Sequence, residues 1–170
     1  MKFTKQIRIK FFTIIILFFT LISSNLNAQV TVTAGGGAAA VIAGLGGPGL
    51  TISNVTINCA ATAYGQFSNG ASSGLGVNAG FMLTTGNVSQ LTGTNLNDDF
   101  STCNGTSGSD PQLTALSSSA TNDLCVIEFD VVPQCATMSI TFVFGSDEYT
   151  NWANQSFNAA FGFFVRPPTP

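Results

Sequence analysis

The sequence has no histidine, very few charged residues and a single tryptophan. Charged side chains make up 8% of the 170 residues, and the five basic ones stand at positions 2, 5, 8, 10 and 166. The chain therefore lacks the commonest general base, the Ser-His-Asp and Cys-His catalytic systems, and a Schiff-base lysine beyond residue 10. Zinc sites built on histidine are excluded as well. Carboxylates are the remaining groups on which catalysis could rest.

The amino terminus has the three-part pattern of a secretory signal peptide. Four basic residues in MKFTKQIRIK precede the apolar run FFTIIILFFTLI, and small and polar residues then lead to Ala28. An apolar core of about 12 residues is shorter than the roughly 20 that span a bilayer. We expect residues 1–28 to be removed and the mature chain to be secreted or held at the cell surface, without inserting into the membrane. The alternative is an anchor retained in the mature protein.

Removal of this leader makes the chain strongly acidic. Arg166 is then the one basic residue against eight acids, a formal charge of −7, and the first acid is Asp98. A surface without cations cannot neutralise phosphates, so we exclude nucleic acid and anionic lipid as partners. The partners left are neutral or cationic molecules and metal ions, among them other surface proteins and glycans.

Four cysteines in an exported chain predict up to two disulfides. They are Cys59, Cys103, Cys125 and Cys135. The segment CVIEFDVV alternates as a strand, which separates Cys125 from Cys135 by about 30 Å and excludes a bond between them. If two bonds form, this also excludes Cys59 with Cys103. Of the pairings that remain we favour Cys59 with Cys135 and Cys103 with Cys125; unpaired thiols are the alternative.

Short runs of alternating apolar residues, separated by Gly, Asn, Ser and Pro, predict strands and turns through the mature chain. We expect strands in QVTVTA, LTISNVTIN (with an irregularity at its Ser-Asn pair), AYGQFS and FMLTTG. Residues 29–48 are assigned to a Gly/Ala-rich amino-terminal stretch ahead of the β domain, and the run GGGAAAVIAGLGGPG, which follows QVTVTA, is predicted to be flexible. Residues 87–109 are predicted to be a loop. One short helix is expected near residues 110–117, with Asp110 as N-cap and Pro111 in the first turn.

Two segments after this helix have the clearest strand pattern. LCVIEFDVV and MSITFVFGS are predicted to form a hairpin, with Ile140, Phe142 and Phe144 facing the core and Glu128 and Asp130 facing outward. AAFGFFV, almost continuously apolar, is predicted to be a strand buried on both faces. The fold class is therefore all-β, a β-sandwich of jelly-roll type. Because the chain stops at RPPTP, directly after an apolar strand, we expect the sandwich to be incomplete.

Several of these segments resemble the choice-of-anchor L domain, a module of exported bacterial surface proteins that is common in the Bacteroidetes. They are GLTISNVTINCAATAYGQFSNG, LGVNAGFMLTTGNV, SGSDPQLTAL, CVIEFDVVPQCATMSITFVFGSDEY and SFNAAFGFFV, in this order. The similarity covers residues 49–170 and is most specific between Glu128 and Val165. It implies a secreted or surface-held β domain with no established enzymatic role. Members usually continue into further strands and an anchoring segment, so the resemblance implies a carboxy-terminal truncation.

The adjacent acids Asp147 and Glu148 stand between two aromatic, apolar runs and invite three interpretations. Successive residues of extended backbone point to opposite faces, so the pair is a poor catalytic dyad. Calcium binds carboxylate and amide oxygens, which Asp147, Glu148, Asn151 and Asn154 offer, with Asp98, Asp99 and Asp110 as further sources. The simplest interpretation is structural: Asp147 caps a turn and Glu148 contacts the backbone or Arg166.

Two aromatic residues beside these acids resemble the rim of a sugar-binding site. Tyr149 and Trp152 could stack on carbohydrate, or pack over the edge of the core. We therefore predict a non-enzymatic structural or adhesive surface module that needs no cofactor, with calcium as an optional ligand. The alternative is a carbohydrate-binding module or, less favoured, a glycoside hydrolase that uses carboxylates.

Overall fold

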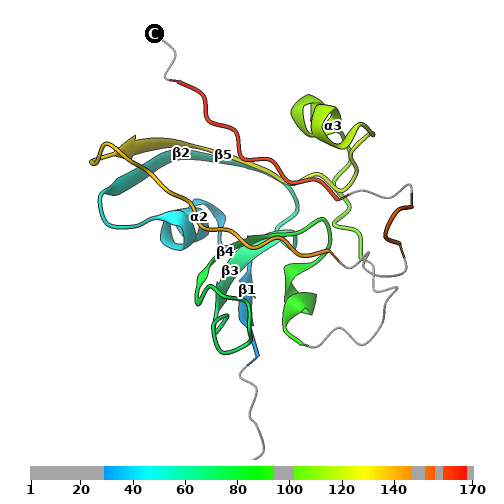
Figure 1. Ribbon diagram of the computed structural model, residues 1–170, viewed down its shortest axis with the longest axis horizontal. Helices are drawn as coiled ribbons and strands as arrows, with labels where there is room; N and C mark the ends of the chain where they lie inside the picture. The colour runs from blue at the N-terminus through cyan, green and yellow to red at the C-terminus, as the bar shows by residue number, and fades with distance from the viewer. Residues whose placement is uncertain (1–28, 94–101, 147–151, 156–158, 168–170) are drawn as a thin grey trace, which may run out of the picture.

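The computed structural model describes residues 29–93, 102–146, 152–155 and 159–167, and shows antiparallel strands with a few short helices (Figure 1). The first sheet has three strands in the order β1–β3–β4, formed by β1 (Thr31–Ala34), β3 (Tyr64–Ser68) and β4 (Gly80–Leu83). The second sheet pairs β2 (Leu50–Asn58) with β5 (Val126–Pro133). The β-rich class predicted from the sequence is confirmed; the packing of the sheets as a sandwich stays a prediction.

The β2–β5 pair is the longest ladder among the described residues. Leu50 lies opposite Pro133 and Asn58 lies opposite Val126, with a shift in register between Ser53 and Thr56. Asn54 has a φ of 51°, in the left-handed region that asparagine tolerates better than most residues. The irregularity predicted at the Ser-Asn pair is therefore confirmed as a bulge.

The alternation predicted for β5 is also observed. Glu128 and Asp130 are exposed, whereas Ile127, Phe129 and Val131 are partly buried. Because side chains alternate across a strand, one face of β5 carries the acids and the other carries the larger apolar groups.

The Gly/Ala-rich stretch is a helix, so its predicted flexibility is wrong. Helix α2 (Gly37–Leu45) contacts β2, β3 and β4, and its Ala40 and Val41 are buried. Glycine is a poor helix former, but burial of an apolar face supplies stability that propensity does not. A Cβ at Gly44 would lie 2.9 Å from the Cβ of Phe81, so a glycine is needed where the helix approaches β4.

Two further helical segments occur. Helix α3 (Pro111–Ser117) confirms the helix predicted near residues 110–117: the Oδ1 of Asp110 accepts hydrogen bonds from the backbone N–H groups of Gln112 and Leu113 at 2.8 and 2.9 Å. Within the predicted loop, η1 (Val88–Leu91) forms a 3-10 turn whose Val88 is fully buried. The expectation of a single helix is therefore wrong. Neither α2 nor α3 has the length and hydropathy that a membrane span requires.

The buried apolar core of the described chain comes from β2, β3, α2, η1 and the residues directly before β3 and Cys125. Its members are Ala40, Val41, Ile52, Ala63, Tyr64, Val88 and Leu124. Tyr64 also contacts the ring of Phe81 at a centroid distance of 5.9 Å.

The hairpin predicted between residues 124–132 and 138–146 is not formed. β5 pairs with β2 instead, and residues 137–146 are assigned to no strand and are exposed. Ile140, Phe142 and Phe144, predicted to face the core, are 47%, 61% and 54% exposed. Residues 159–165, predicted to be a doubly buried strand, are likewise assigned to no strand, and Val165 is 71% exposed.

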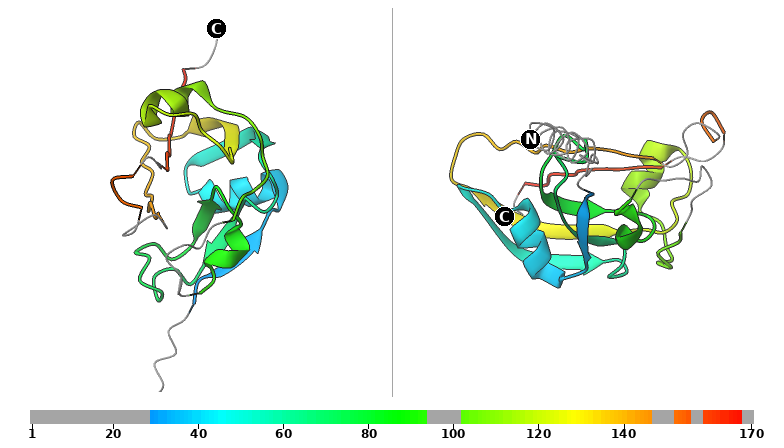
Figure 2. Two further views of the ribbon diagram at one scale, coloured as in Figure 1. Left: turned by 90° about the vertical axis from the view of Figure 1, so that its right-hand side faces the viewer. Right: turned by 90° about the horizontal axis from the view of Figure 1, so that it is seen from below.

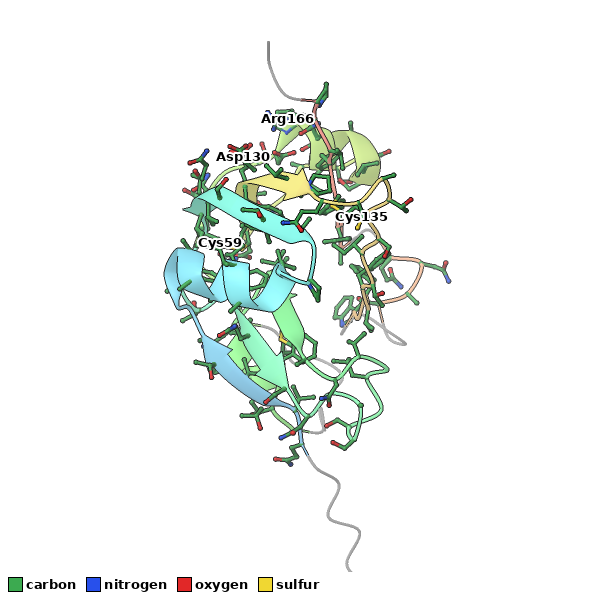
Figure 3. All side chains as sticks on the ribbon, turned by 90° about the vertical axis from the view of Figure 1, so that its left-hand side faces the viewer. Cys59, Asp130, Cys135 and Arg166 are labelled. Atoms are coloured by element: carbon green, nitrogen blue, oxygen red, sulfur yellow. A yellow bond between two sulfur atoms is a disulfide. The ribbon has the colours of Figure 1, made fainter. Side chains whose placement is uncertain are left out.

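The disulfide joins Cys59 to Cys125, with a Cα–Cα distance of 4.5 Å, so the favoured pairing is wrong. The β2–β5 register explains the difference: Cys59 follows Asn58 and Cys125 precedes Val126, which are opposite each other. Cys135 lies at the other end of this ladder, beside Gly49 (Figure 3). Cys103 and Cys135 are unbonded and exposed, and the predicted separation of Cys125 from Cys135 is confirmed.

Substitution of Val41 tests whether α2 belongs to the folded core. We expect Val41→Ala to lower the free energy of unfolding by roughly 1.5–3 kcal/mol, because a fully buried side chain loses two methyl groups. Ile42, 44% exposed in the same helix, is the matched control, and Ile42→Ala should have a clearly smaller effect. Equal effects in urea titrations would contradict the burial of α2.

Loss of the disulfide tests the ladder. The bond closes a separation of 66 residues, and removal of a native disulfide from a small secreted domain costs about 2–5 kcal/mol. We expect this loss in the Cys59→Ser/Cys125→Ser variant and little change in the Cys103→Ser/Cys135→Ser variant, measured by thermal unfolding. Peptide mapping without reductant should recover Cys59 linked to Cys125; recovery of Cys59 linked to Cys135 would refute the register.

Candidate interaction surface

Most residues of the predicted calcium and sugar sites lie outside the described chain. These are Asp147, Glu148, Tyr149 and Asn151, together with Asp98 and Asp99. Trp152 is described and is 40% exposed. Asn154 is exposed as well and has a φ of 65°. The calcium site and the aromatic rim therefore remain predictions.

Two of the described acids hold the backbone in place. Asp110 caps α3, as predicted. Asp123, with a φ of 51°, accepts hydrogen bonds at its Oδ1 from the backbone N–H groups of Asn104 and Gly105 at 3.1 and 3.2 Å. The Asn104 side chain in turn donates to the Asp123 carbonyl at 2.7 Å and accepts from the Thr106 N–H. These hydrogen bonds hold the segment after residue 102 close to Cys125.

The acids of β5 have partners on the outer face of the strand. The Nη2 of Arg166 lies 3.1 Å from the Oε1 of Glu128, and both side chains are largely exposed. Asp130 accepts a hydrogen bond from the Asn54 side chain at 2.6 Å. Arg166, which the sequence offered as a partner of Glu148, thus contacts Glu128. Within the described residues, no group of three or more His, Cys, Asp or Glu side chains is arranged to hold a metal ion.

The most prominent feature left is a surface of large apolar side chains on two extended segments, residues 138–145 and 159–165. We call it the apolar surface. Its exposed members are Met138, Ile140, Phe142, Val143, Phe144, Phe161, Phe163, Phe164 and Val165, with exposed fractions from 41% to 71%. Large apolar side chains that gather on a protein surface commonly mark binding sites.

The two segments of the apolar surface meet each other and α3. The rings of Phe142 and Phe161 have centroids 5.6 Å apart. A Cβ at Gly162 would lie 3.1 Å from the Cδ2 of Leu113, so the second segment passes close to α3. The ion pair of Arg166 with Glu128 attaches the end of this second segment to β5. Figure 2 shows both segments as ribbons without arrows.

The backbone of the first segment has no strand partner within the described chain. Residues 138–145 make no backbone hydrogen bond with another described residue. Their N–H and C=O groups resemble those of an edge strand, which readily pair with another extended chain. The sequence also carries no charge from Ala136 to Ser146 and from Ala159 to Val165. Apolar side chains, unpaired extended backbone and lack of charge therefore coincide here.

Comparison with known families identifies the chain. A family model of the choice-of-anchor L domain matches residues 39–170. The chain belongs to the choice-of-anchor L domain family. The match begins within α2, ten residues before the boundary that we predicted at residue 49. No curated protein and no solved structure matches the chain.

Membership of this family confirms the resemblance found in the sequence. Choice-of-anchor domains are associated with secreted or cell-surface proteins and are not a known enzyme family. The acids with described contacts act in a helix cap, a loop cluster and pairs on the surface.

Sequence reasoning missed Asp123 and the true disulfide. A signal for the disulfide was present: Cys59 directly follows the strand pattern LTISNVTIN, and Cys125 is the second residue of the strand pattern LCVIEFDVV. Antiparallel pairing of these two strands would bring the cysteines together. Asp123 offered no comparable signal, because its role depends on a contact with a loop 18 and 19 residues away.

Substitution of Asp123 tests the loop cluster. Asp123→Ala removes the acceptor of two backbone N–H groups and places alanine at a positive φ, so we expect a loss of roughly 1–3 kcal/mol in unfolding free energy. Asp123→Asn retains an acceptor oxygen and a residue type that tolerates this φ, and should cost clearly less. Equal losses in urea titrations would argue against the cluster.

Proposed function

We propose that this protein is an exported, non-enzymatic module of a bacterial surface, with a structural or adhesive role exerted through protein contacts. Family membership supports the surface association. The apolar surface is the observation that carries the adhesive part, since exposed apolar side chains without charge suit the desolvated centre of a protein interface. The ion pair of Arg166 with Glu128 lies at the end of its second segment.

A hydrolase is disfavoured by the arrangement of the described acids. Glu128 and Asp130 share an exposed strand face, and each has a partner there, Arg166 and Asn54 respectively. A glycosidase acid needs an environment that raises its pKa, commonly a buried one, and a second carboxyl across the substrate. The exposed face of β5 offers no buried site for a substrate.

Carbohydrate binding through Tyr149 and Trp152, and calcium binding through Asp147, Glu148 and Asn151, are separate proposals. The partial exposure of Trp152 is compatible with the first. Calorimetric titration with calcium tests the second: heat that disappears in the Asp147→Asn/Glu148→Gln variant would support it. An unchanged melting temperature and the absence of heat would end it.

Export and surface display test the proposed function directly. We expect intact cells that express the protein with its own leader to show it accessible to added protease, with a mature amino terminus at Gln29 by mass spectrometry. Ile15→Arg places a charge in the apolar core of the leader and should retain the chain inside. A wild-type chain confined to the cytoplasm would contradict the proposal.

A further inference from the structure

An unbonded cysteine, Cys103, lies at the same end of the β2–β5 ladder as the disulfide. Asn104, the next residue, donates its backbone N–H to the Oδ1 of Asp123 at 3.1 Å and its side-chain amide to the Asp123 carbonyl at 2.7 Å. Asp123 stands two residues before Cys125. Since successive Cα atoms are about 3.8 Å apart, only a few residue lengths separate Cys103 from Cys125.

The other half of the disulfide is close to the same segment. The N–H of Ala60, which directly follows Cys59, donates to the Oγ1 of Thr106 at 3.2 Å. Residues 102–106 therefore contact the chain beside both bonded cysteines. Three of the four cysteines thus belong to one end of the ladder.

The fourth cysteine lies at the opposite end. The side chain of Cys135 is beside Gly49, where Leu50 pairs with Pro133. The eight residues of β5 span roughly 26 Å at about 3.3 Å per residue. A disulfide needs Cα atoms within about 7 Å, so Cys135 cannot reach the Cys59–Cys125 bond in the folded chain. Cys135 is exposed and unbonded like Cys103, which makes it a matched control.

The hydrogen bonds of Asp123 keep the third thiol apart from the disulfide. Asn104 and Thr106 are partly buried and bonded to the fold, whereas Cys103 is exposed to solvent. A thiolate must reach a sulfur atom of the disulfide to exchange with it. Loss of the bonds to Asp123 would free the segment to make this approach.

We propose that Cys103 is an exchange thiol for the Cys59–Cys125 bond, and that the hydrogen bonds of Asp123 control the exchange. When they open, the Cys103 thiol loses its proton to solvent and the thiolate attacks the Sγ of Cys125. The Cys103–Cys125 bond forms, the Cys59–Cys125 bond breaks, and Cys59 leaves as a thiolate that takes up a proton. No oxidant or reductant is consumed.

Attack at Cys125 is favoured over attack at Cys59 for two reasons. The contact of Asn104 with Asp123 is nearer to Cys103 along the chain than the contact of Thr106. The Cys103–Cys125 bond also closes the shorter loop. The product no longer ties β2 to β5, so the exchange acts as a switch on the central ladder. It goes beyond the proposed function, because it depends on the fold and not on a partner.

The wild-type chain and Asp123→Ala test this exchange. The oxidised, folded chain is incubated at mildly alkaline pH without added thiol, quenched with acid and alkylated, and its disulfides are identified by peptide mapping. The first isomer that the wild-type chain forms should contain Cys103–Cys125. It should form roughly tenfold faster in Asp123→Ala, which lacks the acceptor that holds the backbone N–H groups of Asn104 and Gly105. Asp123→Asn, which retains an acceptor, should stay closer to the wild-type rate.

Matched variants separate local opening from general instability. Val41→Ala removes buried volume from α2 and leaves the Asp123 hydrogen bonds in place, so it should exchange at close to the wild-type rate. Adding Cys103→Ser to Asp123→Ala should abolish the fast exchange. Adding Cys135→Ser instead should leave its rate unchanged.

Three results would overturn the inference. They are the absence of a Cys103–Cys125 isomer from both the wild-type chain and Asp123→Ala, a first isomer that contains Cys135, and an acceleration in Val41→Ala as large as in Asp123→Ala. The identity of the first isomer is measured on the unmodified chain, so the test decides even if a variant does not fold. Failure of the exchange leaves the proposed function standing, since export and surface display are measured separately.

Discussion

The antiparallel pairing of β2 with β5, closed by the Cys59–Cys125 bond, is the interaction on which the rest of the described structure depends. It brings together segments nearly seventy positions apart in the chain, and its register places the two cysteines within bonding distance. The residues between the two strands include β3, β4, α3 and the loop fastened by Asp123. The ladder and its disulfide therefore close a stretch of chain that contains all of these elements.

The segment that follows β5 lies outside the buried core. β5 pairs with β2 and with no other strand among the described residues. Residues 138–145 have exposed apolar side chains and lie next to the second apolar segment, which Phe161 and Arg166 attach to the fold. The described chain therefore combines a small buried core with two segments of large exposed apolar side chains.

Local sequence patterns predicted where strands and helices lie better than they predicted which segments contact each other. Alternation located β1, β2, β3 and β5, the Asp110–Pro111 pair located α3, and the Ser-Asn pair marked the bulge of β2. The wrong predictions have one physical origin. The helix α2, the disulfide pairing and the exposure of residues 138–145 all depend on contacts between distant segments, which a local sequence pattern does not contain. The glycine-rich composition of α2 did not predict a helix, because the stability of this helix comes from the burial of Ala40 and Val41. Family membership, by contrast, was readable from the order of the motifs.

Hydrogen exchange of β2 and β5, with and without the Cys59–Cys125 bond, tests the central claim most directly. Backbone N–H groups without a partner exchange rapidly, whereas those of a paired strand are protected. The account predicts that the paired amides of β2 and β5 are protected in the wild-type chain and lose much of this protection in the Cys59→Ser/Cys125→Ser variant. Rapid exchange of these amides in the wild-type chain, or protection that the variant retains in full, would contradict it.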